Sequence, residues 1–320
     1  MKSYSIGIDI GGTKITAGIV NTSGDIIDKQ SISTHAEKDP QIVIDSIGEI
    51  FNTLLDNSKK SIDAFEGVGV GFPGNTDGRA GVVLTSSNLP NWDHFPLRDT
   101  LNDLFGLPVT LDNDTNLCTL GEYVYGAGRG TQNMCYLTLS TGTGLGIIVR
   151  GKLLTGNNGT AGELGHVVID IDGPRCTCGK RGCIMAYASG VGISRMVYEA
   201  IEAKEETELQ NNLPSNGQRV KAEIVVEASE RGDAVATRIL ETAGLYSGIA
   251  LSIIIQVLNP EMVVIGGGLT KAGPILLEAA VKSMKKHTQP EIIDSAQVEL
   301  SHLGDDAGIL GAAAQVFTSG

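Results

Sequence analysis

Glu163-Leu-Gly-His166 and Cys176-Thr-Cys-Gly-Lys-Arg-Gly-Cys183 are the two segments around which this sequence is organised. Together they place three thiols and one imidazole between residues 166 and 183, enough to surround one tetrahedral metal ion. Thiolates and a neutral imidazole suit Zn²⁺, and four protein ligands make a closed, structural site. Small buried cysteines are the alternative, but Gly179 and Gly182 supply the tight turns that a metal-binding loop requires. The sequence therefore predicts zinc ligands at His166, Cys176, Cys178 and Cys183.

The same segment also carries candidates for substrate binding. If one ring nitrogen of His166 binds the metal, the other nitrogen is oriented and free to meet a ligand. Glu163 precedes His166 by one helical turn and could stand beside it. We therefore expect a rigid loop that presents a carboxylate and an imidazole to a substrate.

Length and composition favour a soluble protein of two domains. A chain of 320 residues can bury a large core and would normally divide once. The net charge of −13 argues against nucleic acid as a partner, because phosphates require compensating Lys and Arg. Five cysteines, three of them in the predicted metal site, fit a reducing cytoplasm. The N-terminus shows no signal-peptide pattern and the apolar run Ile249–Leu258 is short, so we expect a cytoplasmic protein without a membrane partner.

Two glycine-rich turns repeat one pattern of strand, turn and strand. Asp9-Ile-Gly-Gly-Thr-Lys14 follows the predicted strand Tyr4–Ile10, and Ser140-Thr-Gly-Thr-Gly144 follows Met134–Leu139. Adjacent glycines let backbone N–H groups surround an anion, while Lys14 adds a cation and Asp9 suits a hydrated Mg²⁺. The first turn alone is equally compatible with an ordinary glycine hairpin. The repetition favours phosphate binding by two similar folds that face each other across a cleft.

Polar residues follow two further predicted strands. The strand Gly67–Gly71 leads into Phe72-Pro-Gly74 and a polar loop, which is either a ligand-binding or a plain surface loop. The strand Pro108–Asp112 leads into Asn113-Asp-Thr-Asn116, and a helix is expected to begin near Asn116 with Thr115 or Asn116 as its cap. Capping explains one of these residues but not Asn113 and Asp114 together, so the pattern favours a ligand site at the end of a strand.

Strands alternating with helices predict an α/β architecture. A third glycine turn, Gly266-Gly-Gly268, follows the predicted strand Met262–Ile265 and suits a flat ring or a phosphate. The apolar periodicity predicts helices over Pro40–Asp56, Ile193–Ala203, Ala222–Ser229, Ala234–Leu258, Pro274–Lys286 and Ala307–Phe317.

Taken together, these motifs resemble the ROK family of sugar kinases and sugar-responsive repressors. The resemblance spans nearly the whole chain, and its most specific part is the His and Cys motif. It implies the actin-like ATPase (ribonuclease H-like) fold, with two α/β domains and a cleft between them. Residues 1–116 plus 304–320 would form the small N-terminal domain, and residues 117–303 the large domain that carries the zinc loop. The carrying residues are Asp9–Lys14, Phe72–Gly74, Asn113-Asp114, Thr141–Gly144, Glu163–His166, Cys176–Cys183 and Gly266–Gly268.

The resemblance also implies an activity, namely ATP-dependent phosphorylation of the 6-hydroxyl of glucose to glucose 6-phosphate. Asp114 would be the general base, Asp9 would face the Mg²⁺ that accompanies ATP, and zinc would be structural. The implied partners are a sugar and ATP, and family analogy suggests a homodimer or homotetramer. The sugar would be bound by Gly74, Asn88, Asn113, Asp114, Glu163 and His166. ATP would be bound by Gly12, Thr13, Lys14, Thr141, Gly142, Thr143, Gly144, Gly267 and Gly268.

One position departs from the family pattern. The cysteine motif of the family usually continues to a Glu that binds sugar hydroxyls, and this chain has Met185 there. Because a thioether accepts hydrogen bonds poorly, one alternative is a kinase for a modified hexose, such as an N-acyl or amino sugar. A non-catalytic sugar sensor is the other alternative. Repressors of the family carry a DNA-binding helix-turn-helix ahead of the first glycine turn, and with Asp9 so close to Met1 we expect none here.

Overall fold

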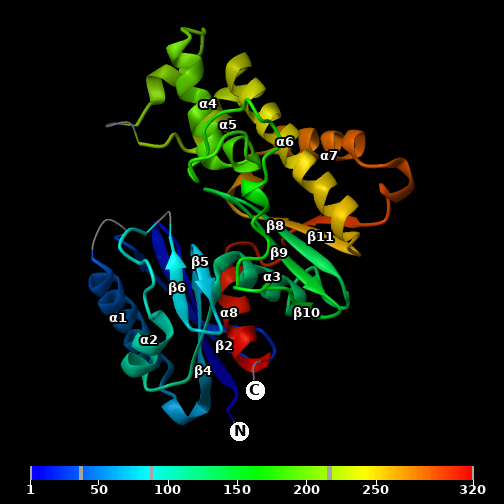
Figure 1. Ribbon diagram of the computed structural model, residues 1–320. Helices are drawn as coiled ribbons and strands as arrows, with labels where there is room; N and C mark the ends of the chain where they lie inside the picture. Colours follow the sequence, from blue (N-terminus) through cyan, green and yellow to red (C-terminus); the bar gives the residue numbers. More distant parts are fainter. Residues whose placement is uncertain (1, 36–38, 87–88, 215–217, 319–320) are drawn as a thin grey trace. The chain divides into compact units, whose positions relative to one another are not determined.

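The computed structural model describes residues 2–35, 39–86, 89–214 and 218–318 (Figure 1). The chain divides into two compact units. Unit 1 comprises Met1–Tyr136, Gly146–Gly162 and Ser301–Gly320, and unit 2 comprises Leu137–Leu145 and Glu163–Leu300. Both units combine helices with strands, which confirms the α/β class that the alternating sequence pattern predicts.

Unit 1 is built on a five-stranded sheet with the order β3-β2-β1-β4-β7. Strands β1 (Tyr4–Ile10), β2 (Lys14–Asn21) and β3 (Ile26–Ser33) are antiparallel neighbours. Strands β4 (Phe65–Phe72) and β7 (Val109–Asn113) run parallel to β1. Because parallel strands end at the same edge of a sheet, the carboxyl ends of β1, β4 and β7 come together, where open α/β sheets bind ligands.

One face of this sheet carries the main apolar core of unit 1. The side chains of Ile6 and Ile8 are fully buried there. They belong to one cluster with the apolar side of helix α1 (Pro40–Ser58) and of helix α2 (Leu97–Phe105), which lie on the same side of the sheet in Figure 1. The period of apolar residues in α1 thus matches its role as a helix packed on a sheet.

The opposite face is covered by helix α8 (Ala307–Thr318), which approaches the sheet backbone very closely. A Cβ atom built on Gly7 would lie 2.0 Å from the carbonyl oxygen of Ile309, and one on Gly69 would lie 1.9 Å from that of Ala312. Real Cβ atoms cannot approach an oxygen so closely, so these positions require glycine. The C-terminal helix therefore packs on the N-terminal sheet and belongs to the same unit.

Helix α3 (Asp114–Val124) packs on α8 from the other side. A Cβ on Gly311 would lie 1.7 Å from the carbonyl oxygen of Leu117, so the two helices also meet through glycine. Residues 117–136 consequently lie in unit 1, together with residues 146–162. The resemblance to the ROK family implied a second domain of residues 117–303, which includes both ranges.

A second five-stranded sheet has the order β10-β9-β8-β11-β12, and unit 2 contributes β11, β12 and parts of β8 and β9.

Helices α6 and α7 of unit 2 approach each other closely at a glycine. A Cβ on Gly248 of α6 would lie 2.2 Å from the Ala280 carbonyl oxygen of α7. A two-stranded hairpin, β5-β6, also lies in unit 1. The remaining bounds are β5 (Asn75–Asp77), β6 (Val82–Thr85), β8 (Met134–Leu139), β9 (Thr143–Val149), β10 (Lys152–Leu153), β11 (Met262–Gly266), β12 (Gln297–Leu300), α4 (Gly190–Glu202), α5 (Ala222–Glu230), α6 (Ala234–Leu258) and α7 (Pro274–His287).

Helix α6 is the one helix among the described residues that is long and apolar enough to cross a membrane. Most of its apolar window, 61%, is buried inside the structure. The core helix of a soluble protein has the same length and composition, so this feature is weak evidence for a membrane span.

Candidate functional site

Asp9 and Asp114 come together at the carboxyl edge of the unit 1 sheet. Asp9 is near the end of β1, and Asp114 is the first residue of α3, directly after β7. Between them lies Gly71 of β4, whose added Cβ would lie 3.5 Å from Asp9 Oδ1 and 3.6 Å from Asp114 Cα. Burial, together with the charge of Asp114, raises the pKa of Asp9 to about 7, and the nearby Lys14 opposes this. Two carboxylates stabilise a bound metal cation, and the lysine beside them stabilises an anion that accompanies it.

The turn from β7 into α3 is held by Asn113. Its side-chain Oδ1 accepts hydrogen bonds from the backbone N–H groups of Thr115 (2.9 Å) and Asn116 (3.3 Å), so Asn113 is the N-cap. The prediction that the helix begins near Asn116 with Thr115 or Asn116 as its cap is therefore wrong. Because β7 extends to Asn113, the cap falls earlier and Asp114 starts the helix at the sheet edge.

The Asn113 amide also connects the predicted sugar-binding residues. Its Nδ2 donates a hydrogen bond of 3.0 Å to the carbonyl oxygen of Gly74. Gly74 itself lies tightly against the end of β6, since a Cβ there would be 2.5 Å from the Thr85 carbonyl oxygen. Gly74 and Asn113 thus form one bonded pair. The predicted residue Asn88 lies outside the described part of the chain.

The first glycine turn projects from the same sheet. Its ends are closed by a hydrogen bond from the Gly11 N–H to the Lys14 carbonyl oxygen, 2.9 Å, and by one from Thr34 Oγ1 to the Gly11 carbonyl oxygen, 2.6 Å. Gly12, Thr13 and Lys14 are exposed. The turn is therefore pinned at its base and leaves its tip accessible to a phosphate.

The second and third glycine turns lie together in unit 2. A Cβ on Gly267 would be 2.4 Å from the Leu139 carbonyl oxygen, and one on Gly268 would be 3.9 Å from Ser140 Oγ. In the second turn Thr141 is exposed, whereas Thr143 is buried and its hydroxyl donates to the Ala188 carbonyl oxygen. Thr143 therefore fixes the turn through its side chain, and Thr141 with the glycines forms the accessible part.

The predicted metal ligands converge in unit 2. One ligand atom from each of His166, Cys176, Cys178 and Cys183 lies within 4.8 Å of the other three. His166 Nδ1 is 3.5 Å from Cys176 Sγ, and Cys178 Sγ is 3.7 Å from Cys183 Sγ. Three thiols and an imidazole at these separations are a donor set that fits one tetrahedral metal ion.

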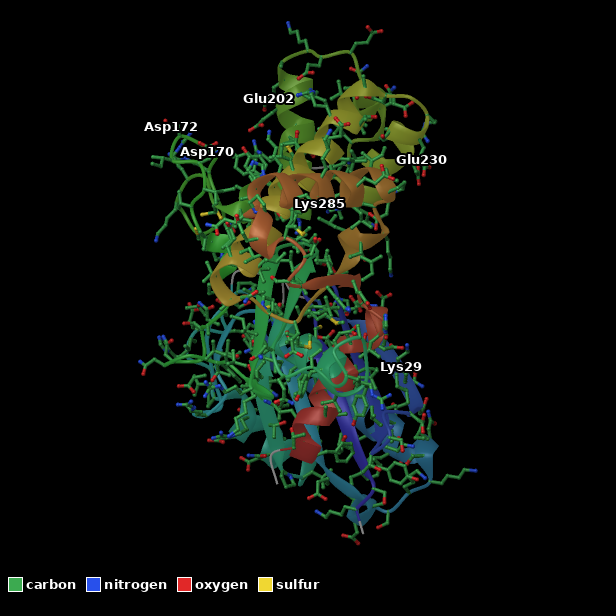
Figure 2. The ribbon with its side chains drawn as sticks, turned by 90° about the vertical axis from the view of Figure 1, so that its right-hand side faces the viewer. Lys29, Asp170, Asp172, Glu202, Glu230 and Lys285 are labelled. Atoms are coloured by element: carbon green, nitrogen blue, oxygen red, sulfur yellow. The ribbon has the colours of Figure 1, made fainter. Side chains whose placement is uncertain are left out.

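The loop around these ligands is shaped by the predicted glycines. Gly179 and Gly182 both have positive φ, 86° and 67°, and a Cβ on Gly182 would overlap the Asp170 carbonyl oxygen at 1.4 Å. The Asp170 carboxylate accepts a hydrogen bond from the Tyr187 hydroxyl, which ties the loop to the rest of unit 2. Figure 2 shows Asp170 and its neighbour Asp172 on this loop.

His166 has its two ring nitrogens directed at different partners. Nδ1 faces the cysteine cluster, whereas Nε2 lies 3.9 Å from the Glu163 carboxylate. Both side chains are partly exposed. Met185, two residues after Cys183, lies beside the second glycine turn, with its Sδ 3.5 Å from a Cβ built on Gly142. The predicted metal ligands, Glu163, Met185 and the second turn thus occupy one region of unit 2.

Comparison with known proteins agrees with this arrangement. The family model described as "ROK family" matches residues 5–318. The chain belongs to the ROK family. It is 38% identical over 312 residues to a glucokinase of Thermotoga maritima, covering 98% of this chain and 96% of that one. It is also 29% identical to a xylose repressor of Bacillus spizizenii, covering 96% of this chain and 75% of the repressor.

Among solved structures, this ROK protein is similar to a ROK family glucokinase from Streptomyces griseus in complex with glucose and AMPPNP. The TM-score is 0.82 at 33% identity, and the match covers 97% of this chain and 98% of the other. The expected actin-like, two-domain α/β fold is confirmed by this likeness.

Two residues of this ROK protein support the site without having been predicted for it. Gly71 leaves room between Asp9 and Asp114. Asp112 is buried, and its Oδ1 accepts 2.7 Å hydrogen bonds from the Asn113 N–H and from Asn116 Nδ2. An acidic residue directly after Val109 and Leu111 in a short strand is the signal that could have revealed Asp112 from the sequence.

Proposed function

We propose that this protein is an ATP-dependent hexokinase that transfers the γ-phosphoryl group of ATP to the 6-hydroxyl of glucose. The observation that carries the proposal is Asp114, which starts a helix at the sheet edge beside Asp9 and next to Asn113. Membership of the ROK family and the similarity to glucokinases over nearly the whole chain support it.

Asp114 is proposed as the general base. Phosphoryl transfer requires alignment, charge neutralisation and an oriented nucleophile, with little covalent help from the protein. A carboxylate beside the 6-hydroxyl accepts its proton as the oxygen attacks, a contribution of about 10²- to 10⁴-fold. The backbone N–H of Thr115 donates to Asp114 Oδ1 (2.7 Å), which helps to orient the carboxylate.

Asn113 and Gly74 are proposed to bind the hydroxyls of the sugar. The Oδ1 of Asn113 already accepts two backbone hydrogen bonds, and one hydrogen of Nδ2 is used on the Gly74 carbonyl. The second Nδ2 hydrogen therefore remains for a sugar oxygen, so Asn113 acts as a donor. Asn88 is proposed to line the same pocket.

The glycine turns are proposed to bind ATP with its Mg²⁺. Gly12, Thr13 and Lys14 offer exposed backbone and a cation for the phosphates, and Asp9 offers a carboxylate to the hydrated ion. Mg²⁺ supplies charge neutralisation on the phosphates. In unit 2 the proposed nucleotide-binding residues are Thr141, Gly142, Thr143, Gly144, Gly267 and Gly268.

The metal bound by the His and Cys cluster is proposed to be a structural zinc ion. With four protein ligands the site has no open position for water, so its role is to fix the loop. Binding through His166 Nδ1 leaves Nε2 and the neighbouring Glu163 for sugar hydroxyls, and the Nε2 to Oε2 distance of 3.9 Å is compatible with both groups holding one ligand.

The preferred sugar is the finer part of the proposal, and Met185 bears on it. A kinase for an N-acyl or amino hexose is the second candidate, because a thioether cannot accept the strong hydrogen bonds that a Glu would accept there. A panel of hexoses and hexosamines, assayed for ADP release with ATP and Mg²⁺, separates these alternatives. Glucose turnover supports the first proposal, selective turnover of a modified sugar supports the second, and no turnover supports a sugar sensor.

We further propose that the protein is cytoplasmic, does not bind nucleic acid, and forms a homodimer or homotetramer. The net charge of −13 supports the statement on nucleic acid. Apolar side chains exposed on α6, Leu245 at 42% and Val257 at 73%, support self-association. Light scattering coupled to size-exclusion chromatography tests the oligomeric state.

A further inference from the structure

Unit 1 contains a cavity of about 590 Å³ that none of the roles above uses. Its inner wall is formed by β7, an edge strand of the sheet, and by the end of α8. The turn at residues 77–79 and the segment 151–159 enclose it from outside. The cavity has a volume typical of small-molecule sites, and Asp9, Gly74, Asn113 and Asp114 are not among its lining residues.

Basic side chains outnumber acidic ones at the outer rim of this cavity. Arg79 and Lys152 are both exposed and line it. Within the described ranges, neither has a carboxylate within ion-pair distance. Arg98 also lines the cavity, but its guanidinium donates to the carbonyl oxygens of Arg79 and Ala80. Asp77 on the same turn also lines the cavity, but its Oδ1 accepts hydrogen bonds from the backbone N–H groups of Arg79 and Ala80. Two exposed cations against this one engaged carboxylate, on a chain with a net charge of −13, favour an anionic ligand.

The inner wall offers hydrogen-bonding groups rather than charge. Thr110 Oγ1 is buried and has no hydrogen-bond partner in the part of the chain that the structure describes. Asp112 is buried next to it. Burial raises the pKa of its carboxyl group, and hydrogen bonds from Asn116, Asn113 and Gln315 offset part of this increase. Apolar atoms of Leu111 and Leu153 line the same space. A wall of this kind suits hydroxyl groups on a carbon skeleton.

We propose that this cavity is a second binding site, for a sugar phosphate. The phosphate monoester lies between Arg79 and Lys152, and the hydroxyls of the sugar reach Thr110 and Asp112. Asp112 also accepts a hydrogen bond from the backbone N–H of Asn113. The bound sugar phosphate therefore contacts the strand that carries the proposed sugar site of the kinase. The inference goes beyond the proposed kinase activity and does not depend on it.

Hydrogen–deuterium exchange of the intact protein shows which peptides a ligand protects, and so tests where it binds. The ligands to be compared are glucose 6-phosphate, gluconate and inorganic phosphate. We expect glucose 6-phosphate to slow exchange in peptides covering residues 107–112 and 150–158, which exclude Asn113 of the proposed kinase site. The double variant Arg79→Ala, Lys152→Ala should bind it at least about 10-fold more weakly at these peptides, since two charge-assisted contacts are lost. The matched control Lys2→Ala, Arg129→Ala removes two exposed cations of unit 1 outside the cavity and should behave as the wild type.

Several results would overturn the proposal. Unchanged exchange in both peptides, or equal protection in the double variant and the wild type, would show that the cavity does not bind the probe. Equal protection by gluconate would overturn the assignment of a phosphate group, and equal protection by inorganic phosphate would overturn the role of the hydroxyls. Because exchange is measured without turnover, failure here is distinguishable from failure of the kinase proposal, and both double variants should retain the activity of the wild type.

Discussion

Replacing Asp9 by Asn should stabilise the ligand-free protein while removing its activity. Asp9 is held in a partly buried position beside Asp114, and its pKa is raised from 3.8 to about 7. A carboxyl group with a raised pKa costs folding free energy once it is ionised, at about 1.36 kcal/mol per unit. The upper limit is therefore about 4 kcal/mol, and because the residue is partly exposed to water we expect about 2 to 3 kcal/mol.

The pH dependence of this effect has a definite sign. Below about pH 4, Asp9 is protonated in both the folded and the unfolded chain, so its ionisation costs nothing. Between pH 4 and pH 7 the unfolded chain releases the proton and the folded chain keeps it, so the contribution of Asp9 to stability falls as pH rises. Above pH 7 both states are ionised and the cost is constant. The advantage of Asp9→Asn should thus grow up to pH 7 and then level off.

Urea unfolding at pH 5, 6, 7 and 8, without Mg²⁺ or ATP, measures this difference directly. Asp45→Asn, which removes an exposed carboxylate of α1, is the control for a general change in net charge. Mg²⁺ with ATP should raise the melting temperature of the wild type but not that of Asp9→Asn, because the asparagine offers no charge to the ion. A variant that is less stable than the wild type at pH 8, or an advantage that does not vary with pH, would refute the reasoning.

Three further changes test other parts of the account. Gly69→Ala should destabilise the protein by about 1 to 3 kcal/mol or more in urea unfolding, because the new Cβ meets the Ala312 carbonyl oxygen at 1.9 Å; an unchanged midpoint would contradict the packing of α8. Metal analysis of the untreated protein should find one zinc per chain. Removing this metal with a chelator, or replacing Cys178 by Ser, should lower the melting temperature and expose residues 164–185 to proteolysis. Met185→Glu should raise kcat/KM for glucose about 10-fold or more, since one charge-assisted hydrogen bond is worth about 1.5 to 3 kcal/mol; unchanged kinetics would argue against placing residue 185 at the sugar.

Much of the fold could be predicted because its signals are local. The strands β1 and β8 and the helix α6 have the bounds predicted from the sequence pattern. The convergence of His166, Cys176, Cys178 and Cys183 was likewise predictable, because the three cysteines are closely spaced on one loop with two glycines between them. These features depend on neighbours within a few tens of residues.

The errors and omissions arise where distant parts of the chain decide. Asn113, Thr115 and Asn116 can all cap a helix, and only the pairing of β7 with β4 selects Asn113. The unit boundary depends on the close approach of α3 to α8, which are separated by most of the chain. The cavity beside β7 is invisible in the sequence, because Arg79, Lys152 and Asp112 come from three segments that only the fold brings together.

The measurement that most directly tests the central claim is the rate of glucose 6-phosphate formation by the wild type and by Asp114→Asn, with saturating ATP and Mg²⁺. Asparagine keeps the shape of the side chain but cannot accept the proton of the 6-hydroxyl. We predict that the wild type forms glucose 6-phosphate and that kcat falls by about 10²-fold or more in the variant, with glucose binding largely retained. Full activity in Asp114→Asn would contradict the assignment of this carboxylate as the general base.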